Sequence, residues 1–241
     1  MLSPLETWTA AEYAGAVQET VQERLRTEIP VILAGGSTLH LSALVDGLST
    51  IPGVPAGVRT ALERELETHG LAALVQELEQ VDPVSAAGID TANPRRVVRA
   101  LEVYRHTGTP ISDFRDRRVS PPYRYATVYL RPARDWLYAR LDARVDAMVR
   151  QGLFDEVAGL LGSGVPPDAP GLNSIGYREI VGALTGVYSP EEAVELVKRN
   201  TRRYAKRQYT YFDKYFATAS VIDPAHTMPG DAAIDRMLAR E

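Results

Sequence analysis

Near its C-terminal end the chain reads Lys198-Arg199-Asn200-Thr201-Arg202-Arg203-Tyr204-Ala205-Lys206-Arg207-Gln208-Tyr209-Thr210-Tyr211-Phe212, a run of cations with aromatic residues between them. The run contains no Gly or Pro. It follows Ser189-Pro190-Glu191-Glu192, in which Ser can cap a helix, Pro fits the first turn and the acids favour the helix N-terminus. We therefore predict one long helix. Its cations share roughly half of the helix circumference: Arg199, Arg202, Arg203, Lys206 and Arg207.

Such a crowd of like charges repels itself unless anions lie close by, and two interpretations supply them. In the first, a neighbouring element presents acidic side chains and the face is an ordinary solvated surface. In the second, the helix is a phosphate track with aromatic platforms, an arrangement that holds single-stranded nucleic acid. Charge alone does not separate the two.

The composition indicates a soluble globular protein whose positive charge is local, because the 241 residues carry a net charge of −4. This length suits one large domain, or one domain with an insertion. The absence of cysteine excludes disulfides, thiol catalysis and Cys-type zinc sites, and the scattered histidines predict no metal site. No apolar run approaches the roughly 20 residues of a membrane span. We expect a cytoplasmic monomer with no membrane partner.

The first part of the chain has the pattern of an α/β unit. Thr9 to Glu12 has the spacing of a capping box and begins an amphipathic helix. Val31 to Ala34 is a short apolar run, as in a buried parallel strand, and Gly35-Gly36-Ser37 leads into a helix at Leu41 to Val45. A glycine pair after a strand lets a ligand approach the backbone, although a plain turn is the more common explanation.

A series of helices follows, predicted at Arg59 to Leu66, Gly70 to Val81, Asp82 to Gly88 and from Asn93 onward. In the last, Arg95 and Arg99 flank an apolar stripe. Cations at a helix start oppose the helix dipole. Either bound phosphate or an ion pair with an acid such as Glu77 or Glu79 would compensate them.

The rest of the chain returns to the α/β pattern. We predict strands at Tyr125 to Leu130 and Ala219 to Ile222, an amphipathic helix at Asp135 to Val149 and a closing helix at Asp231 to Leu238. Asn173 to Glu179 contains a Gly-Tyr-Arg turn, which is a packing device more often than a site.

The order of several motifs resembles that of the tRNA dimethylallyltransferase (isopentenyl-tRNA transferase) family. Gly35 to His40 resembles G-G-T-x-L-Y, with Ser37 for Thr and His40 for Tyr. The remaining matches are Asp82 to Ala86 with D-P-x-x-A, Arg99 to Gly108 with R-A-L-E-V-x-x-x-T-G, Ser174 to Glu179 with A-I-G-Y-K/R-E, and Thr201 to Tyr211 with T-R-x-x-A-K-R-Q-x-T-W, in which Tyr211 replaces Trp.

The resemblance implies a fold and a reaction. The fold would be an α/β, P-loop-NTPase-like parallel-sheet core, truncated at its N-terminus and formed by residues 1–47 and 123–241, with a mostly helical insertion at 48–122 that contacts tRNA. The reaction would transfer a dimethylallyl group from dimethylallyl diphosphate to N6 of the adenosine 3′-adjacent to the anticodon. Mg²⁺ would assist the departure of diphosphate.

The resemblance also assigns roles to residues. Ser37 would lie beside the target base as a catalytic residue, and Arg178 would bind the diphosphate, which the fixed fork of a guanidinium suits. The residues that would contact the tRNA anticodon stem-loop are Ser37, Arg59, Arg95, Arg96, Arg99, Arg202, Arg203, Lys206, Arg207, Gln208 and Tyr211.

Family members of full length begin with a strand, a G-x-T-x-x-G-K-S/T phosphate loop and an Asp general base, which this sequence does not contain. We therefore expect impaired transfer. A non-catalytic fragment that binds the anticodon stem-loop is the alternative. A small-molecule phosphotransferase also fits an α/β core, but it would need the phosphate loop.

Overall fold

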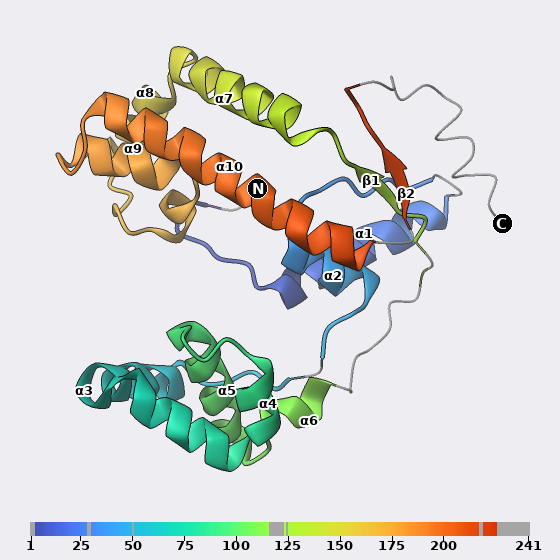
Figure 1. Cartoon of the computed structure of the whole chain (residues 1–241), viewed down its shortest axis with the longest axis vertical. Coiled ribbons are helices and arrows are strands. Elements are labelled where there is room, and N and C mark those ends of the chain that lie inside the picture. Colours follow the sequence, from blue (N-terminus) through green and yellow to red (C-terminus); the bar gives the residue numbers. More distant parts are fainter. Residues whose placement is uncertain are drawn as a thin grey trace. The chain divides into compact units, whose positions relative to one another are not determined.

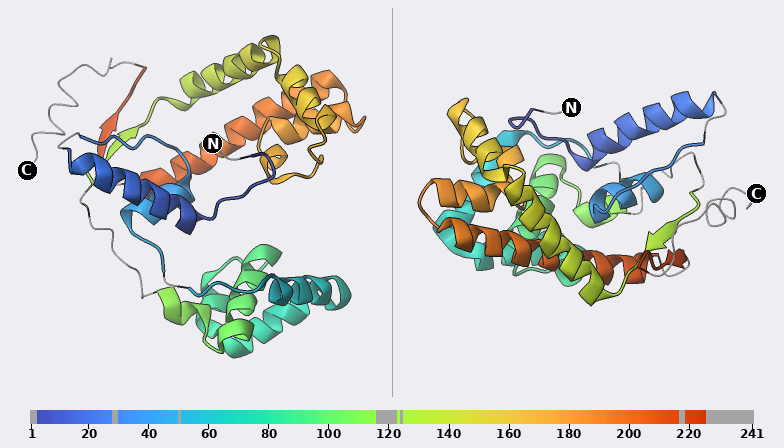
Figure 2. Two further views of the ribbon diagram at one scale, coloured as in Figure 1. Left: turned by 180° about the vertical axis from the view of Figure 1, so that it is seen from behind. Right: turned by 90° about the horizontal axis from the view of Figure 1, so that it is seen from above.

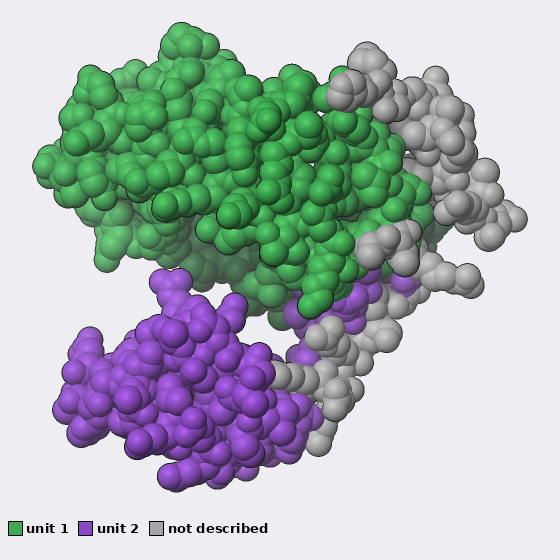
Figure 3. All heavy atoms as spheres, in the orientation of Figure 1, with its two compact units in different colours: residues 1–41, 124–241 green, residues 42–123 purple. Residues whose placement is uncertain are grey.

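The computed structural model describes residues 3–27, 30–49, 51–115, 123, 125–216 and 219–225. The chain divides into two compact units, Met1–Leu41 with Arg124–Glu241 and Ser42–Tyr123 (Figure 3). The sequence predicts boundaries after Gly47 and Pro122, and the assignment of the two parts to a core and a tRNA-contacting insertion stays a prediction. Pro122 itself and the closing helix predicted at Asp231 to Leu238 lie outside the described residues.

The unit from Ser42 to Tyr123 is helical, as predicted. It contains α3 (Ala56–Val81), α4 (Pro83–Gly88), α5 (Pro94–Thr107) and α6 (Ile111–Arg115) (Figure 1). Gly70 interrupts α3 with φ 77° and ψ 169°, so that α3 consists of two helices across a kink, as the separate predictions for Arg59 to Leu66 and Gly70 to Val81 required. One buried core joins α3 to α5: Leu62, Leu74, Leu78, Val97, Val98, Ala100 and Leu101.

Polar side chains fix the same helices at their ends. Asp82 is buried and caps α4, with one carboxylate oxygen accepting from the Ser85 backbone N–H (2.9 Å) and the other from the Ser112 N–H (3.1 Å). Arg105 of α5 donates to Glu65 and Glu77, which belong to the two halves of α3. These contacts hold the kinked α3 against α5.

The other unit contains α1 (Ala10–Leu25), the start of α2 (Thr38–Val45), α7 (Arg134–Arg150), α8 (Leu153–Gly162), the 3₁₀ turn η1 (Pro170–Asn173), α9 (Tyr177–Leu184) and α10 (Pro190–Tyr215). The predicted long helix is confirmed in α10, which opens with a capping box formed by Ser189 and Glu192. α7 runs alongside α10, and α1 lies beside α2 (Figure 2). The core of this unit packs α8, η1, α9 and the start of α10 together: Leu153, Val157, Ala169, Leu172, Ile180, Val181 and Ala193.

The sheet is smaller than the predicted parallel-sheet core. In the described residues it consists of β1 (Val128–Leu130) and β2 (Ser220–Ile222), paired in parallel with Tyr129 opposite Val221. These strands confirm the two later predictions with shorter bounds.

The strand predicted at Val31 to Ala34 is wrong. The backbone there is not a strand, and Ile32 is 77% exposed. A strand forms only by pairing with a neighbour, and an apolar run cannot show whether a partner is present. The described part of the chain places no strand beside it.

The C-terminal half of α10 is tied to the sheet. The Tyr209 hydroxyl donates to the Pro132 carbonyl (2.7 Å), two residues after the end of β1. Arg131 makes a bidentate pair with Asp213 of α10 (2.7 and 3.0 Å). These contacts join the C-terminal half of α10 to the segment that follows β1. Within the described residues, no helix has the length and apolarity that crossing a bilayer requires.

Candidate nucleic-acid interface

The basic helix α10 meets the glycine turn before α2. Gln208 Nε2 donates to the Gly36 carbonyl oxygen at 2.7 Å. A Cβ atom on residue 36 would lie 2.2 Å from that nitrogen, so only glycine admits the Gln208 amide in this position. Ser37 follows directly, and its Oγ accepts from the His40 N–H at the start of α2 (3.4 Å). The structure therefore brings together two predicted site residues, Ser37 and Gln208, from distant parts of the sequence.

A group of aromatic side chains from α1 and the segment before it packs next to this turn. The His40 ring stacks on Tyr13 with centroids 4.4 Å apart, and Trp8 meets Tyr13 edge-on at 6.5 Å. Sequence reasoning missed this group, because it predicted only an amphipathic helix in this part of the chain. The one sequence feature that could have indicated an aromatic group here is position 40, where the family motif has Tyr and this chain has His. Stacking places the imidazole where a phenol ring would also fit.

One group of cations on α10 is neutralised by α7. Lys198 pairs with Asp146 at 2.7 Å, and Arg202 pairs with Asp142 at 2.5 Å. For these side chains, the interpretation with acids from a neighbouring element is correct. Arg202 is thus engaged within the protein and does not project freely toward a ligand.

A second group of α10 cations forms no ion pair with any described residue: Arg199, Arg203, Lys206, Arg207 and Lys214. All are exposed. At 3.6 residues per turn they fall within about 100° of the helix circumference and span about 22 Å along its axis. We call this group the free basic stripe. Arg207 also lies over the Tyr204 ring, 5.6 Å from its centroid. The stripe is a concentration of positive charge on an otherwise acidic chain.

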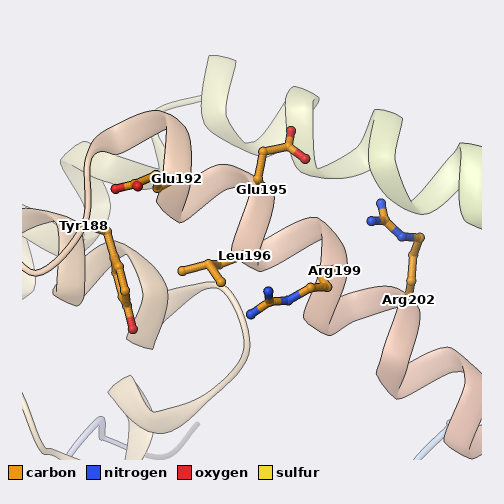
Figure 4. A pocket seen from close by; sticks show the side chains of 6 residues that line it. All are labelled: Tyr188, Glu192, Glu195, Leu196, Arg199 and Arg202. Carbon is orange, nitrogen blue, oxygen red and sulfur yellow. The ribbon is translucent and has the colours of Figure 1, made fainter.

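One depression lies along the first half of the stripe, with a volume of about 410 Å³. Figure 4 shows the Arg199 and Leu196 side chains on the same side of α10 as Tyr188, whereas Glu195 and Arg202 point toward α7. The depression is lined by acids as well as cations, Glu192 and Glu195 beside Arg199 and Arg202, so its charge is mixed.

Arg178 is oriented by a buried carboxylate. Glu179 is 4% exposed, and its Oε1 accepts from Arg178 Nε (2.7 Å) and from Asn200 Nδ2 of α10 (2.8 Å). Its Oε2 accepts from the Gly176 N–H (2.8 Å). Burial alone would raise the pKa of Glu179, but the Arg178 guanidinium and the Gly176 and Asn200 hydrogen bonds together lower it.

The Arg178 side chain remains 48% exposed. Because its Nε faces Glu179, its terminal nitrogens are left for an anion. Sequence reasoning missed Glu179 and Asn200 as the groups that hold Arg178, although Glu179 closes the matched motif. The Glu179–Asn200 bond places Arg178 next to α10.

In the other unit, the predicted cations fall into two groups. Arg59 pairs with Glu63 (3.0 Å) and Arg99 with the buried Glu102 (2.5 Å), both within their own helices. Arg95 and Arg96 are exposed at the start of α5, and neither forms an ion pair with a described residue. Their backbone is capped by Asn93, whose side chain accepts from the Arg95 N–H (3.1 Å).

Of the two acids suggested as partners for Arg95 and Arg99, Glu77 binds Arg105 near the other end of α5, and Glu79 forms no ion pair with a described residue. Neither acid therefore neutralises Arg95 or Arg99. The unfavourable placement of Arg95 and Arg96 against the helix dipole therefore stays uncompensated in the described protein, which favours an external anion.

Comparison with known proteins agrees with the motifs. A family model described as IPP transferase matches residues 1–215. The tRNA dimethylallyltransferase of Salinibacter ruber is 45% identical over 211 residues, which cover 87% of this chain and 65% of that protein. The tRNA dimethylallyltransferase of Geobacter sulfurreducens is 41% identical and is covered to 73%. This chain thus spans about two thirds of the length of these relatives.

Solved structures agree as well. A full-length tRNA isopentenylpyrophosphate transferase from Bacillus halodurans superimposes with a TM-score of 0.61 at 34% identity, over 92% of this chain and 69% of that chain. A eukaryotic dimethylallyltransferase acting on tRNA superimposes with a TM-score of 0.76 over 92% of this chain and 58% of that one, and at 22% identity it supports the fold. The chain belongs to the tRNA dimethylallyltransferase (IPP transferase) family.

Proposed function

We propose that this chain binds the anticodon stem-loop of a tRNA and serves the transfer of a dimethylallyl group from dimethylallyl diphosphate to N6 of the adenosine 3′-adjacent to the anticodon. The observation that carries the proposal is the contact between Gln208 and Gly36 beside Ser37, on the same helix as the free basic stripe. Through this contact, the turn at Gly36 and Ser37, which we propose accepts a base, lies against the helix whose cations suit the RNA backbone.

The proposed roles follow from exposure and charge. Arg203, Lys206 and Arg207 bind phosphates, Ser37 and Gln208 contact the extruded base, and Tyr211 offers a stacking surface. Arg95 and Arg96 contribute RNA contacts from the insertion, whereas Glu63 and Glu102 already neutralise Arg59 and Arg99. We leave Arg202 out of the free contacts because Asp142 already neutralises it.

In the proposed reaction, a bond forms between adenine N6 and the allylic carbon while the bond from that carbon to diphosphate breaks. The leaving group gains negative charge, and we assign its stabilisation to Arg178. N6 loses a proton that some base must accept. Asp82 does not serve, because both of its oxygens already accept from backbone N–H groups in a buried site.

Magnesium is expected with the diphosphate, since Mg²⁺ is usually held by substrate phosphates and few carboxylates and there neutralises charge on the leaving group. The residues that the structure describes contain no cluster of His, Asp or Glu that fits a metal ion. We therefore assign the roles above to the side chains alone.

A second candidate is stem-loop binding without transfer. It is favoured by the sequence, which contains no phosphate loop of the G-x-T-x-x-G-K-S/T type. We propose that transfer by these 241 residues is impaired while RNA binding is retained.

The test measures both properties in one preparation. A fluorescent anticodon stem-loop is titrated with the protein at low salt, and the same RNA is then incubated with dimethylallyl diphosphate and Mg²⁺ and analysed by mass spectrometry. We expect salt-dependent binding and little product. Product at the rate of a full-length relative would refute the impairment, and absence of binding at low salt would refute the function.

A further inference from the structure

A second depression lies at the C-terminal end of α10. Its volume is about 500 Å³, and Arg207, Thr210, Tyr211, Lys214 and Tyr215 line it. Thr210 and Tyr215 carry no role in the proposed function, and Lys214 enters it only as one cation of the free basic stripe. The depression therefore raises the question of what ligand it accepts.

Aromatic rings form one wall of the depression. Tyr211 and Tyr215 are stacked with centroids 5.0 Å apart and an interplanar angle of 22°, and Phe216 meets Tyr215 edge-on at 4.9 Å. Tyr215 is thus held in place by its neighbours. Its hydroxyl is buried and has no hydrogen-bond partner among the described residues. Because this hydroxyl is buried, it is Tyr215's ring that lines the depression.

Cations form the other wall. Arg207 and Lys214 are exposed, and neither pairs with a described acid. The one acid in this turn of the helix, Asp213, is bound by Arg131, which lowers the pKa of Asp213. The local acid therefore does not cancel the charge of Lys214, and the depression stays positive.

The depression lies on the same side of α10 as Gln208, which contacts the glycine turn. Tyr211 and Tyr215 follow Gln208 at i+3 and i+7, which places them on the same side of α10, about 4.5 and 10 Å further along its axis. An RNA strand whose extruded base lies at Gly36 and Gln208 would bring an adjacent nucleotide to this surface. A base needs an aromatic platform and its phosphate needs a cation, and the depression offers both.

We propose that Thr210, Tyr211, Lys214 and Tyr215, together with Arg207, form a second nucleotide subsite, which binds one unpaired nucleotide next to the target adenosine. The base stacks on the tyrosine pair and its phosphate pairs with Lys214. The proposal rests on the proposed function, because it assigns this nucleotide to the same RNA.

Lys214→Gln and Tyr215→Leu test the subsite through titrations of the stem-loop over a range of salt concentrations. Lys214→Gln is expected to reduce the slope of log K against log salt by about 0.7 to 0.9, the value for one phosphate contact. Tyr215→Leu is expected to weaken binding about 5- to 150-fold, as base stacking predicts. Tyr215→Phe keeps the ring and should lose less affinity, which separates stacking from misfolding of the helix end.

Matched variants separate the subsite from the proposed function. Lys198→Gln removes a charge that Asp146 already neutralises and should leave the salt slope unchanged. Arg203→Gln should reduce it. If Arg203→Gln has its effect but Lys214→Gln behaves like Lys198→Gln, the subsite is refuted and the function stands. If the wild-type protein binds no stem-loop, both are refuted.

Discussion

At the level of single residues, the contact between Gln208 and Gly36 joins two motifs of the family. The Gln208 amide occupies the space that a side chain at position 36 would need. Position 35 differs, because a Cβ there would meet only Leu41 at 3.9 Å, an ordinary contact. A Cβ atom therefore fits at position 35, whereas at position 36 it requires the Gln208 amide to move.

Gly36→Ala tests this difference. The new methyl group must displace the flexible end of Gln208, so we expect loss of its hydrogen bond and about 0.5–1.5 kcal/mol of unfolding free energy. Stem-loop binding should also weaken, because Gln208 no longer lies beside Ser37. Urea unfolding and RNA titration measure both effects. Gly35→Ala is the matched control, and equal effects of the two substitutions would show that the contact is unimportant.

Glu179 gives a pH-dependent prediction at the same scale. Because its pKa in the folded protein lies below the ordinary value of 4.5, the ionised carboxylate stabilises the fold. That contribution is complete above the ordinary pKa and is lost as pH falls through the lower folded value. Glu179→Gln should cost about 1.5–3 kcal/mol at pH 7 and less in acid.

Urea unfolding at a series of pH values measures this difference. Glu67→Gln is the control, since Glu67 is exposed and forms no described hydrogen bond or ion pair. A constant penalty for Glu179→Gln across the acid range would contradict the role of its charge.

At the level of elements, α7 determines which cations of α10 are available. Asp142 and Asp146 lie one helical turn apart and bind Arg202 and Lys198, also one turn apart. The facing acids neutralise one side of α10 and leave the free basic stripe on the adjoining side. This division was invisible in the sequence, because it depends on the packing of two distant helices.

Asp142→Asn should release Arg202 to the solvent. Since such partly exposed pairs contribute only about 0–1 kcal/mol, stability should change little. RNA affinity at low salt should rise and the salt slope should steepen by up to about 0.9, through one additional phosphate contact. Asp168→Asn, at an exposed acid with no described partner, controls for the change in net charge. An equal gain in both variants would mean that Arg202 is not specifically released.

The kink in α3 belongs to the same scale. Gly70 has a backbone conformation, φ 77° and ψ 169°, that is nearly exclusive to glycine. Gly70→Ala should therefore destabilise the protein by about 1–3 kcal/mol. Gly57→Ala, whose added Cβ meets nothing within 4 Å, is the control in thermal unfolding. Equal melting temperatures for the two variants would contradict a strained kink.

At the level of the whole molecule, local signals predicted the helices well and the sheet poorly. The caps at Thr9, Asn93 and Ser189 act within a few residues, so their sequence patterns sufficed. The strand expected at Val31 to Ala34 failed because strands depend on distant partners. Family motifs predicted roles for Ser37, Gln208 and Arg178, but they did not point to Glu179, which binds Arg178, or to Asp142, which pairs with Arg202.

The most direct measurement is the salt dependence of stem-loop binding for the double variant Arg203→Gln/Arg207→Gln, with Lys198→Gln as control. If the free basic stripe holds the RNA backbone, the double variant lowers the salt slope by about 1.4 to 1.8, as expected for two lost phosphate contacts, and the control does not change it. A double variant with the wild-type slope would contradict an RNA-binding role for α10.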